Sequence, residues 1–204
     1  MEIDIEGSFY DARVDEFGED IRAVGWRSRE QQELRFRILS EGIRNSGITV
    51  LDLGCGFGDL FRFLTRLDIE VSEYVGIDTS RKMVLTSQAA LKQPNVRFEQ
   101  ADLSFKSERH FDYIFLSGTL NLASRRAPAE KLRDLAKFCV SNIAPDGELR
   151  ANFLSTKVDF SNPLNHHFSP IETLSFFQTV FEEVTLVEDY GLYEFTIYCK
   201  GVRT

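Results

Sequence analysis

A glycine-rich loop near residue 50 is the part of the sequence best suited to bind a ligand. Gly54, Gly56 and Gly58 alternate directly after Asp52, the acid near the end of a short apolar run. Because glycine has no Cβ, such a loop can turn sharply and approach a ligand closely. A second apolar run ends in Asp78, whose carboxylate could accept hydrogen bonds from both hydroxyls of a ribose. The pattern predicts a strand, glycine turn, helix and strand that bind an adenosine-type cofactor.

The spacing of the loop distinguishes between cofactors. The dinucleotide fingerprint G-x-G-x-x-G needs its third glycine where this chain has Asp59. A carboxylate at a helix start would repel a pyrophosphate, and Asp52 adds a second negative charge. Two acids favour a ligand with positive charge, such as an ammonium group with a sulfonium centre. Asp52-x-Gly54-x-Gly56-x-Gly58 resembles the first motif of the class I S-adenosylmethionine-dependent methyltransferases. A glycine turn with a purely structural purpose is the alternative.

The resemblance implies contacts to S-adenosyl-L-methionine. The loop would hold the methionine part through backbone N–H groups, and Asp78 would hold the ribose. We interpret Cys55 as a compact side chain under the loop, in preference to a reactive thiol. Residues 76–83 are similar to the family's second motif, in which a residue at the position of Met83 packs on the adenine; core packing of Met83 is an equal alternative. Asp102 resembles the acceptor for the adenine amine, with the backbone N–H of Leu103 reaching a ring nitrogen. A turn or capping role is the alternative for Asp102.

The end of the fourth predicted strand is expected to face the methyl acceptor. The family uses this end, here Ser117-Gly118, to face both the methionine amine and the acceptor. No Asn/Asp-Pro-Pro-Tyr/Phe sequence stands here, which weighs against transfer to a nucleic-acid base amine or a glutamine amide. Oxygen, nitrogen, sulfur and carbon nucleophiles stay open. The expected cofactor-binding residues are Asp52, Gly54, Cys55, Gly56, Gly58, Asp78, Thr79, Met83, Ala101, Asp102, Leu103, Ser117, Gly118 and Trp26.

A general base is needed only if the acceptor is an alcohol or a protonated amine. The candidate catalytic residues are Tyr10 and the adjacent pair His166 and His167. Since adjacent side chains point in different directions, at most one histidine of the pair is expected to act. A solvated loop pair is the alternative. His110 precedes a strand start and is predicted to be structural.

Apolar runs and helical patterns alternate along the chain. They predict an α/β fold with a doubly wound, mostly parallel seven-stranded sheet and a C-terminal antiparallel hairpin, like that of the Rossmann-like methyltransferases. The predicted strands are 48–53, 73–78, 95–100, 111–116, 148–154, 183–189 and 192–200. Ser28, Ser80 and Ser169 are predicted to cap helices, and Pro128 to open one. The helix from Ser28 is expected to stop at Asn45-Ser46-Gly47.

The first residues are expected to be irregular up to about residue 25. We predict one methyltransferase domain over residues 1–204, in which residues 1–27 form an arm or lid. Phe9, Tyr10 and Trp26 could close over the cofactor, and Arg27 and Arg29 could pair with the methionine carboxylate. Ordinary packing of the arm is the alternative.

The composition limits the class of protein and of partner. The chain has 204 residues, 43% hydrophobic and 27% charged, as in a globular domain. Its formal net charge of −8 argues against a nucleic-acid substrate. Three cysteines give neither a disulfide framework nor metal-ligand spacing, and no metal is expected. No leader peptide or bilayer-spanning run appears, so the sequence predicts a soluble, cytoplasmic protein.

Together these features predict an enzyme that moves a methyl group from S-adenosylmethionine to a small-molecule acceptor. The alternative from another class is a non-catalytic subunit that keeps the fold as a binding or scaffold module. Transfer of another group from a modified adenosylmethionine is a second enzyme alternative. The oligomeric state stays open.

Overall fold

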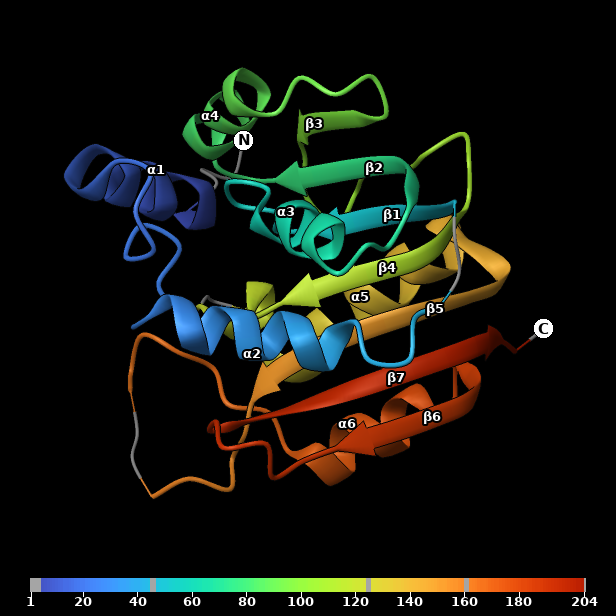
Figure 1. Ribbon diagram of the computed structural model, residues 1–204. Helices are drawn as coiled ribbons and strands as arrows, with labels where there is room; N and C mark the ends of the chain where they lie inside the picture. Colours follow the sequence, from blue (N-terminus) through green and yellow to red (C-terminus); the bar gives the residue numbers. More distant parts are fainter. Residues whose placement is uncertain (1–4, 45–46, 124–125, 160–161, 204) are drawn as a thin grey trace. The chain divides into compact units, whose positions relative to one another are not determined.

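The computed structural model describes residues 5–44, 47–123, 126–159 and 162–203 (Figure 1). The chain divides into two compact units, residues 1–102 and 103–204. Among the described residues, no helix has the length and apolar character to cross a bilayer.

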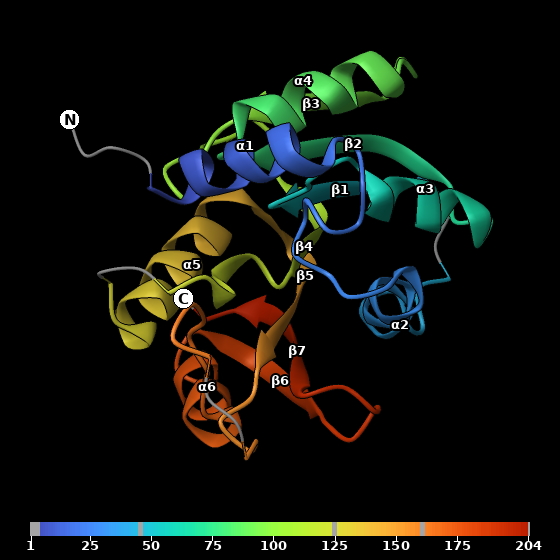
Figure 2. The ribbon, with the colours of Figure 1, turned by 90° about the vertical axis from the view of Figure 1, so that its left-hand side faces the viewer.

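The first unit carries a three-stranded parallel sheet with the order β3-β2-β1. The glycine loop follows the carboxyl end of β1, and Asp78 is the last residue of β2. Its helix α1 lies beside α4 in both views (Figures 1 and 2), and α2 packs against α3. In chain order its elements are α1 (Ile5–Phe17), α2 (Arg29–Leu39), β1 (Ile48–Leu53), α3 (Asp59–Arg66), β2 (Val71–Asp78), α4 (Arg81–Ala90) and β3 (Val96–Gln100).

The second unit carries four strands in the order β4-β5-β7-β6. Strand β5 is parallel to β4, and β7 is antiparallel to both β5 and β6. The hairpin therefore inserts its second strand between its first strand and β5. The elements are β4 (Phe111–Ser117), η1 (Thr119–Asn121), α5 (Pro128–Asn142), β5 (Ile143–Leu154), α6 (Pro170–Phe177), β6 (Phe181–Val187) and β7 (Glu194–Val202).

The strand order β3-β2-β1-β4-β5-β7-β6 confirms the predicted fold class, a mostly parallel seven-stranded sheet with an antiparallel C-terminal hairpin. The predicted helix caps are also confirmed. The hydroxyls of Ser28, Ser80 and Ser169 each accept a hydrogen bond from the backbone N–H three residues later.

Three local predictions were wrong. Residues 5–17, expected to be irregular, form α1. Helix α2 ends at Leu39, where Ser40 caps it, and not at Asn45-Ser46-Gly47; residues 45–46 lie outside the described residues. Strand β5 begins at Ile143 and not at residue 148, because a register shift opposite Phe111 and Tyr113 accommodates the additional residues within the strand.

Helix α1 is stabilised by its packing on the rest of the first unit rather than by the helix propensity of its residues. Tyr10, Val14 and Phe17 follow helical spacing and pack on a buried cluster in the same unit. The Asp11 carboxylate accepts hydrogen bonds from the Ser80 hydroxyl at 2.6 Å and from the Lys82 backbone N–H at 3.1 Å. Asp11 therefore adds a negative charge at the N-terminus of α4, where the helix dipole favours one.

We expect Asp11→Ala to loosen α1, because it leaves the first turn of α4 without this acceptor. The loss should be about 1–2 kcal/mol of local opening free energy, measured by hydrogen exchange of the amides of residues 5–17. Asp15→Ala is the matched control, since Asp15 makes an exposed ion pair with Lys82 that is worth less than about 1 kcal/mol. Equal loss of protection in both variants would contradict this role for Asp11.

Candidate functional site

The glycine loop is anchored to the end of β2. The backbone N–H groups of Gly54 and Cys55 both donate to the carbonyl of Ile77, at 2.8 and 3.0 Å. Gly54, Gly56 and Gly58 have φ values of 75°, 53° and 75°. Side chains other than glycine rarely adopt these left-handed angles, so the three glycines are required by the turn itself.

The loop glycines also meet close neighbours. A Cβ on Gly56 would lie 3.0 Å from Cγ1 of Val24, in the segment between α1 and α2. A Cβ on Gly58 would lie 2.7 Å from Leu91 and 2.9 Å from the ring of Phe98. Gly58 thus serves the packing of the unit, whereas Gly56 faces the N-terminal segment. Cys55 is buried under the loop as predicted, and burial raises the pKa of its thiol.

Asp78 connects the loop to the next helix. One carboxylate oxygen accepts from the Gly56 N–H at 2.9 Å, and the other accepts from the Ser80 N–H at 2.8 Å. Each carboxylate oxygen can accept two hydrogen bonds, so the geometry is compatible with further contacts to ribose hydroxyls. Asp78 is 8% exposed.

Asp52 lies deeper than the sequence suggested. It is 3% exposed and accepts a hydrogen bond from the hydroxyl of Tyr74. Burial raises its pKa to about 7; the Tyr74 hydrogen bond lowers the pKa, and the nearby charges of Asp78 and Asp59 raise it. Near neutral pH this carboxyl is therefore only partly ionised, and it offers a ligand less negative charge than expected.

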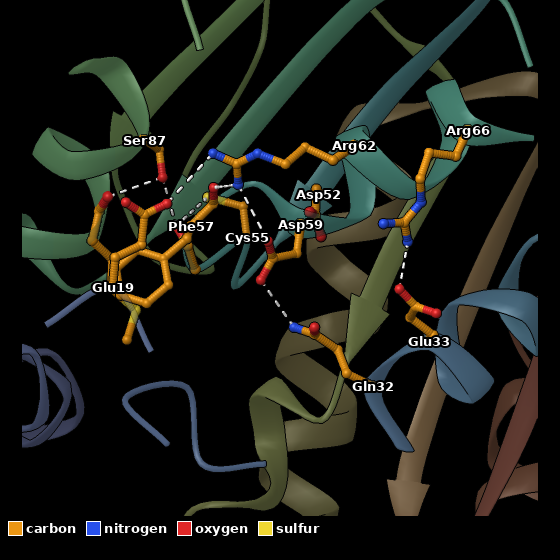
Figure 3. Close-up of polar contacts among 12 residues, drawn as sticks. Glu19, Gln32, Glu33, Asp52, Cys55, Phe57, Asp59, Arg62, Arg66 and Ser87 are labelled. Carbon is orange, nitrogen blue, oxygen red and sulfur yellow. Dashed lines mark hydrogen bonds and ion pairs between the residues drawn. The ribbon is translucent and has the colours of Figure 1, made fainter. Parts of the chain in front are cut away.

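Asp59 is engaged by a polar network at the start of α3 (Figure 3). Its carboxylate accepts from the Gln32 amide at 3.1 Å and pairs with Arg62 at 3.2 Å. Arg62 also donates to the carbonyl of Phe57 at 2.6 Å and lies 3.5 Å from Glu19. The network ties the loop to α2 and to the segment after α1, and it neutralises a charge that the sequence assigned to ligand recognition.

Tyr10 and Met83 belong to one apolar cluster. Buried Ala23, Phe57 and Met83 form its centre, and the partly buried residues around it are Tyr10, Val14, Phe17 and Val24. Burial and the charge of Asp78 raise the pKa of Tyr10 to about 12. A phenol with such a pKa is almost fully protonated at neutral pH, so the cluster disfavours Tyr10 as a general base.

The other predicted residues of the first unit make contacts outside this cluster. Trp26 is partly buried under the guanidinium of Arg35, 3.9 Å from the ring centroid. Ala101 donates its N–H to the carbonyl of Asp78 at 3.0 Å, and Thr79 accepts from Gln100 at 3.1 Å. Asp102 is exposed.

In the second unit, β4 ends at Ser117, and Gly118 turns the chain at a φ of 71°. Leu103, at the start of this unit, is partly buried. The backbone N–H of His166 donates to the carbonyl of Asn121 at 2.7 Å. Asn165 and Leu122 form an isolated antiparallel β-bridge. The His166–His167 loop is thereby held beside the turn that follows β4, and the catalytic role of either histidine stays a prediction. His110 is exposed before β4.

Buried polar groups without hydrogen-bond partners gather on neighbouring strands of the second unit. Within the described residues, the hydroxyl of Ser117 and both amide atoms of Asn152 have no partner. Asn152 is 0% exposed. Each such group costs about 1–3 kcal/mol when it stays unsatisfied. Sequence reasoning missed Asn152; a polar residue inside the apolar run of β5 was the available signal.

Comparisons with known proteins identify the family. A family profile described as "Methyltransferase domain" matches residues 50–142. "Putative methyltransferase Rv1506c" of Mycobacterium tuberculosis is 31% identical over 161 residues, covering 74% of this chain and 92% of the relative. The chain belongs to the class I S-adenosylmethionine-dependent methyltransferases. The methyltransferase uses S-adenosylmethionine as its cofactor.

A further relative matches this methyltransferase over only part of its own length, and the similar solved structures show the fold alone. Carboxy-S-adenosyl-L-methionine synthase of Helicobacter pylori is 38% identical over 76 residues, which cover 35% of this chain and 32% of the synthase. DhpI in complex with SAH has a TM-score of 0.69 at 19% identity, over 98% of this chain and 96% of that one. A methyltransferase in complex with the Haloferax volcanii activator Trm112 has a TM-score of 0.68 at 15% identity, over 97% and 98%.

Asp52 makes the stability of the methyltransferase depend on pH. Folded Asp52 keeps its proton up to about pH 7, whereas the unfolded chain loses it near its ordinary pKa of 3.8. The folded state therefore binds more protons in this interval, and this group lowers the free energy of unfolding as pH rises through it.

We expect Tyr74→Phe to destabilise the protein more at pH 8 than at pH 5. It removes the hydrogen bond that stabilises the carboxylate, at a cost of about 1–3 kcal/mol at pH 8 and about 1 kcal/mol at pH 5, measured by urea unfolding. Asp52→Asn is the control, because it removes the titrating group and should remove the difference. An equal cost of Tyr74→Phe at both pH values would contradict the assignment.

Proposed function

We propose that this methyltransferase transfers its methyl group to a small-molecule acceptor. The observation that carries the proposal is the burial of neutral polar groups, Ser117 and Asn152, at the carboxyl ends of β4 and β5. Ligands of open α/β folds bind at these strand ends. A buried amide can be reached only by a narrow group, which favours a small molecule, and the test below distinguishes it from a side chain or base of a macromolecule. The net charge of −8 also opposes a nucleic-acid acceptor.

A radiolabelled methyl donor tests this proposal. We expect label from S-adenosylmethionine to appear in small alcohols, amines, thiols or carbon acids of a metabolite panel. Bulk tRNA and bulk cell protein, offered at equal mass, are the controls. Transfer confined to either macromolecule would contradict a small acceptor, and no turnover with any acceptor would favour the non-catalytic alternative.

Two of the comparisons suggest other candidates. The solved methyltransferase that is bound to Trm112 suggests a partner subunit. The synthase of Helicobacter pylori suggests formation of a modified S-adenosylmethionine, but it matches over only 32% of its length. One feature bears on the partner subunit. Strand β3 is an edge strand with the charged residues Arg97 and Glu99, and charges on an edge strand oppose the addition of a partner's strand.

Cofactor binding is assigned to the first unit on the geometry of its loop. We assign the methionine part to backbone N–H groups of residues 54–58 and the ribose to Asp78. Met83 and Tyr10 would line the adenine side, with Thr79, Ala101 and Asp102 following. The cofactor supplies a methyl group already activated by a positively charged sulfur. The protein mainly aligns the acceptor, which can contribute about 7–11 kcal/mol to catalysis.

The segment before α2 is proposed to act as a lid. Val24 lies on Gly56, and Tyr10 packs on the cluster around Met83. Both contacts, which lie within the first unit, support a position of this segment over the loop; residues 1–4 lie outside the described residues. Trp26 is engaged with Arg35, which supports a structural role for it within the lid.

We expect Asp78→Ala to weaken binding of S-adenosylhomocysteine by at least about tenfold, since it removes the ribose acceptor and the bond that holds Gly56. Isothermal titration calorimetry measures the affinity. Glu99→Ala, an exposed acid on β3, is the control and should leave the affinity unchanged. Unchanged affinity in Asp78→Ala would refute the assignment.

Of the two adjacent histidines, one is expected to act as the base. His166→Ala or His167→Ala should lower kcat by about 10²–10⁴-fold with little change in cofactor affinity. Tyr10→Phe should retain kcat, because the raised pKa of Tyr10 keeps the phenol protonated. Full turnover in both histidine variants would leave the pair structural.

The three buried free thiols, Cys55, Cys139 and Cys199, support a proposed location in a reducing compartment such as the cytoplasm.

A further inference from the structure

Three neighbouring strands of the second unit place polar side chains in one row. Ser117 on β4 lies opposite Asn152 on β5, and Asn152 lies opposite Thr196 on β7. Residues opposite each other in a sheet project from the same face, with Cβ atoms about 5 Å apart. We call these three residues the polar row.

The polar row is largely buried, and two of its three side chains lack a hydrogen-bond partner among the described residues. Asn152 and Thr196 are both 0% exposed. The Thr196 hydroxyl shares a hydrogen bond with the hydroxyl of Tyr190 at 3.0 Å. Over the described parts of the chain, the Ser117 hydroxyl and the donor and acceptor atoms of Asn152 have no such partner. Buried polar atoms are normally paired, so these atoms need a partner that the described residues do not supply, such as a water molecule or a group of a ligand.

The charged side chain nearest to Asn152 along β5 already has a counter-charge. Arg150, two residues before Asn152, pairs with Glu148 at 2.7 Å. Its guanidinium also lies 5.2 Å from the ring centroid of Tyr113 and 4.7 Å from that of Tyr198. The unpaired atoms of the row are one hydroxyl and one amide, which donate and accept without net charge.

We propose that the polar row binds a neutral donor–acceptor group of the methyl acceptor, namely a hydroxyl or a carboxamide. This inference rests on the proposed transfer to a small molecule. An amide matches a group that both donates and accepts, whereas a carboxylate or an ammonium would lose its hydration without a counter-charge from Ser117 or Asn152. Glu194, buried two residues before Thr196, is the acid that makes a cationic acceptor the competing case.

The first experiment asks whether Asn152 is satisfied without a ligand. In the protein free of ligands, we expect Asn152→Leu to keep or raise Tm by about 2–4 °C, because it removes unpaired buried atoms. Asn142→Leu is the matched control. Asn142 is also 0% exposed, but it accepts from Ser107 and donates to the carbonyls of Phe105 and Phe138, so its replacement should lower Tm. An equal fall in both variants would mean that a buried water satisfies Asn152 and would overturn the proposal.

The second experiment asks what the row binds. The side-chain NH₂ signal of Asn152 is assigned in the ¹H–¹⁵N spectrum by its absence from Asn152→Leu. In protein saturated with S-adenosylhomocysteine, acetamide and ethylene glycol should shift this signal with Kd values at least about tenfold below those of acetate and ethylammonium. No shift with the neutral probes, or tighter binding of either ion, would overturn the proposal.

Cofactor affinity separates this inference from the proposed function. Asn152→Leu should bind S-adenosylhomocysteine within about twofold of the parent protein, because the assigned cofactor contacts lie elsewhere. A parallel loss of cofactor binding would overturn the assignment of the row to the acceptor. Absence of methyl transfer to small molecules by the parent protein would instead refute the proposed function, whatever the Tm values.

Discussion

The carboxylate of Asp78 holds the first unit together at the point where its loops converge. Its two oxygens accept from Gly56 and Ser80, and so join the glycine loop, the end of β2 and the start of α4. Ser80 extends the chain of contacts, because its hydroxyl donates to Asp11 on α1. A single side chain thus sets the geometry of the loop and, through one further residue, the docking of the N-terminal helix. The cofactor is assigned to a site whose polar groups are already ordered by the fold.

The acids around the loop divide by their environment. Asp78 is satisfied by backbone N–H groups, Asp59 by Arg62 and Gln32, and Asp52 by one phenol in a buried position. Burial without a cation leaves Asp52 partly protonated near pH 7. The negative field offered to a cationic cofactor therefore depends more on Asp78 than the sequence suggested. Like charges placed close together are tolerated because one of them can remain neutral.

Sequence patterns predicted the frame of the molecule well. Strand β1 was predicted with its observed bounds, and the caps at Ser28, Ser80 and Ser169 depend on local chemistry that a sequence displays directly. Helix α1 was missed because its stability comes from distant contacts on Phe57 and Met83. The role of Gly58 and the protonation of Asp52 also depend on neighbours remote in sequence, Phe98 and Tyr74. The roles proposed for the cofactor-binding residues and for His166 and His167 stay predictions.

The 3.0 Å approach of Val24 to the Cβ position of Gly56 has a kinetic consequence. No ligand atom fits between the two, so a molecule that reaches this face of the glycine must first displace the valine. Departure of a spent nucleoside and entry of a fresh one would both pass through that displaced state. Movements of such segments occur over microseconds to milliseconds. If the cofactor occupies this face of Gly56, as we propose, the opening of residues around Val24 would limit turnover independently of the chemistry of the acceptor.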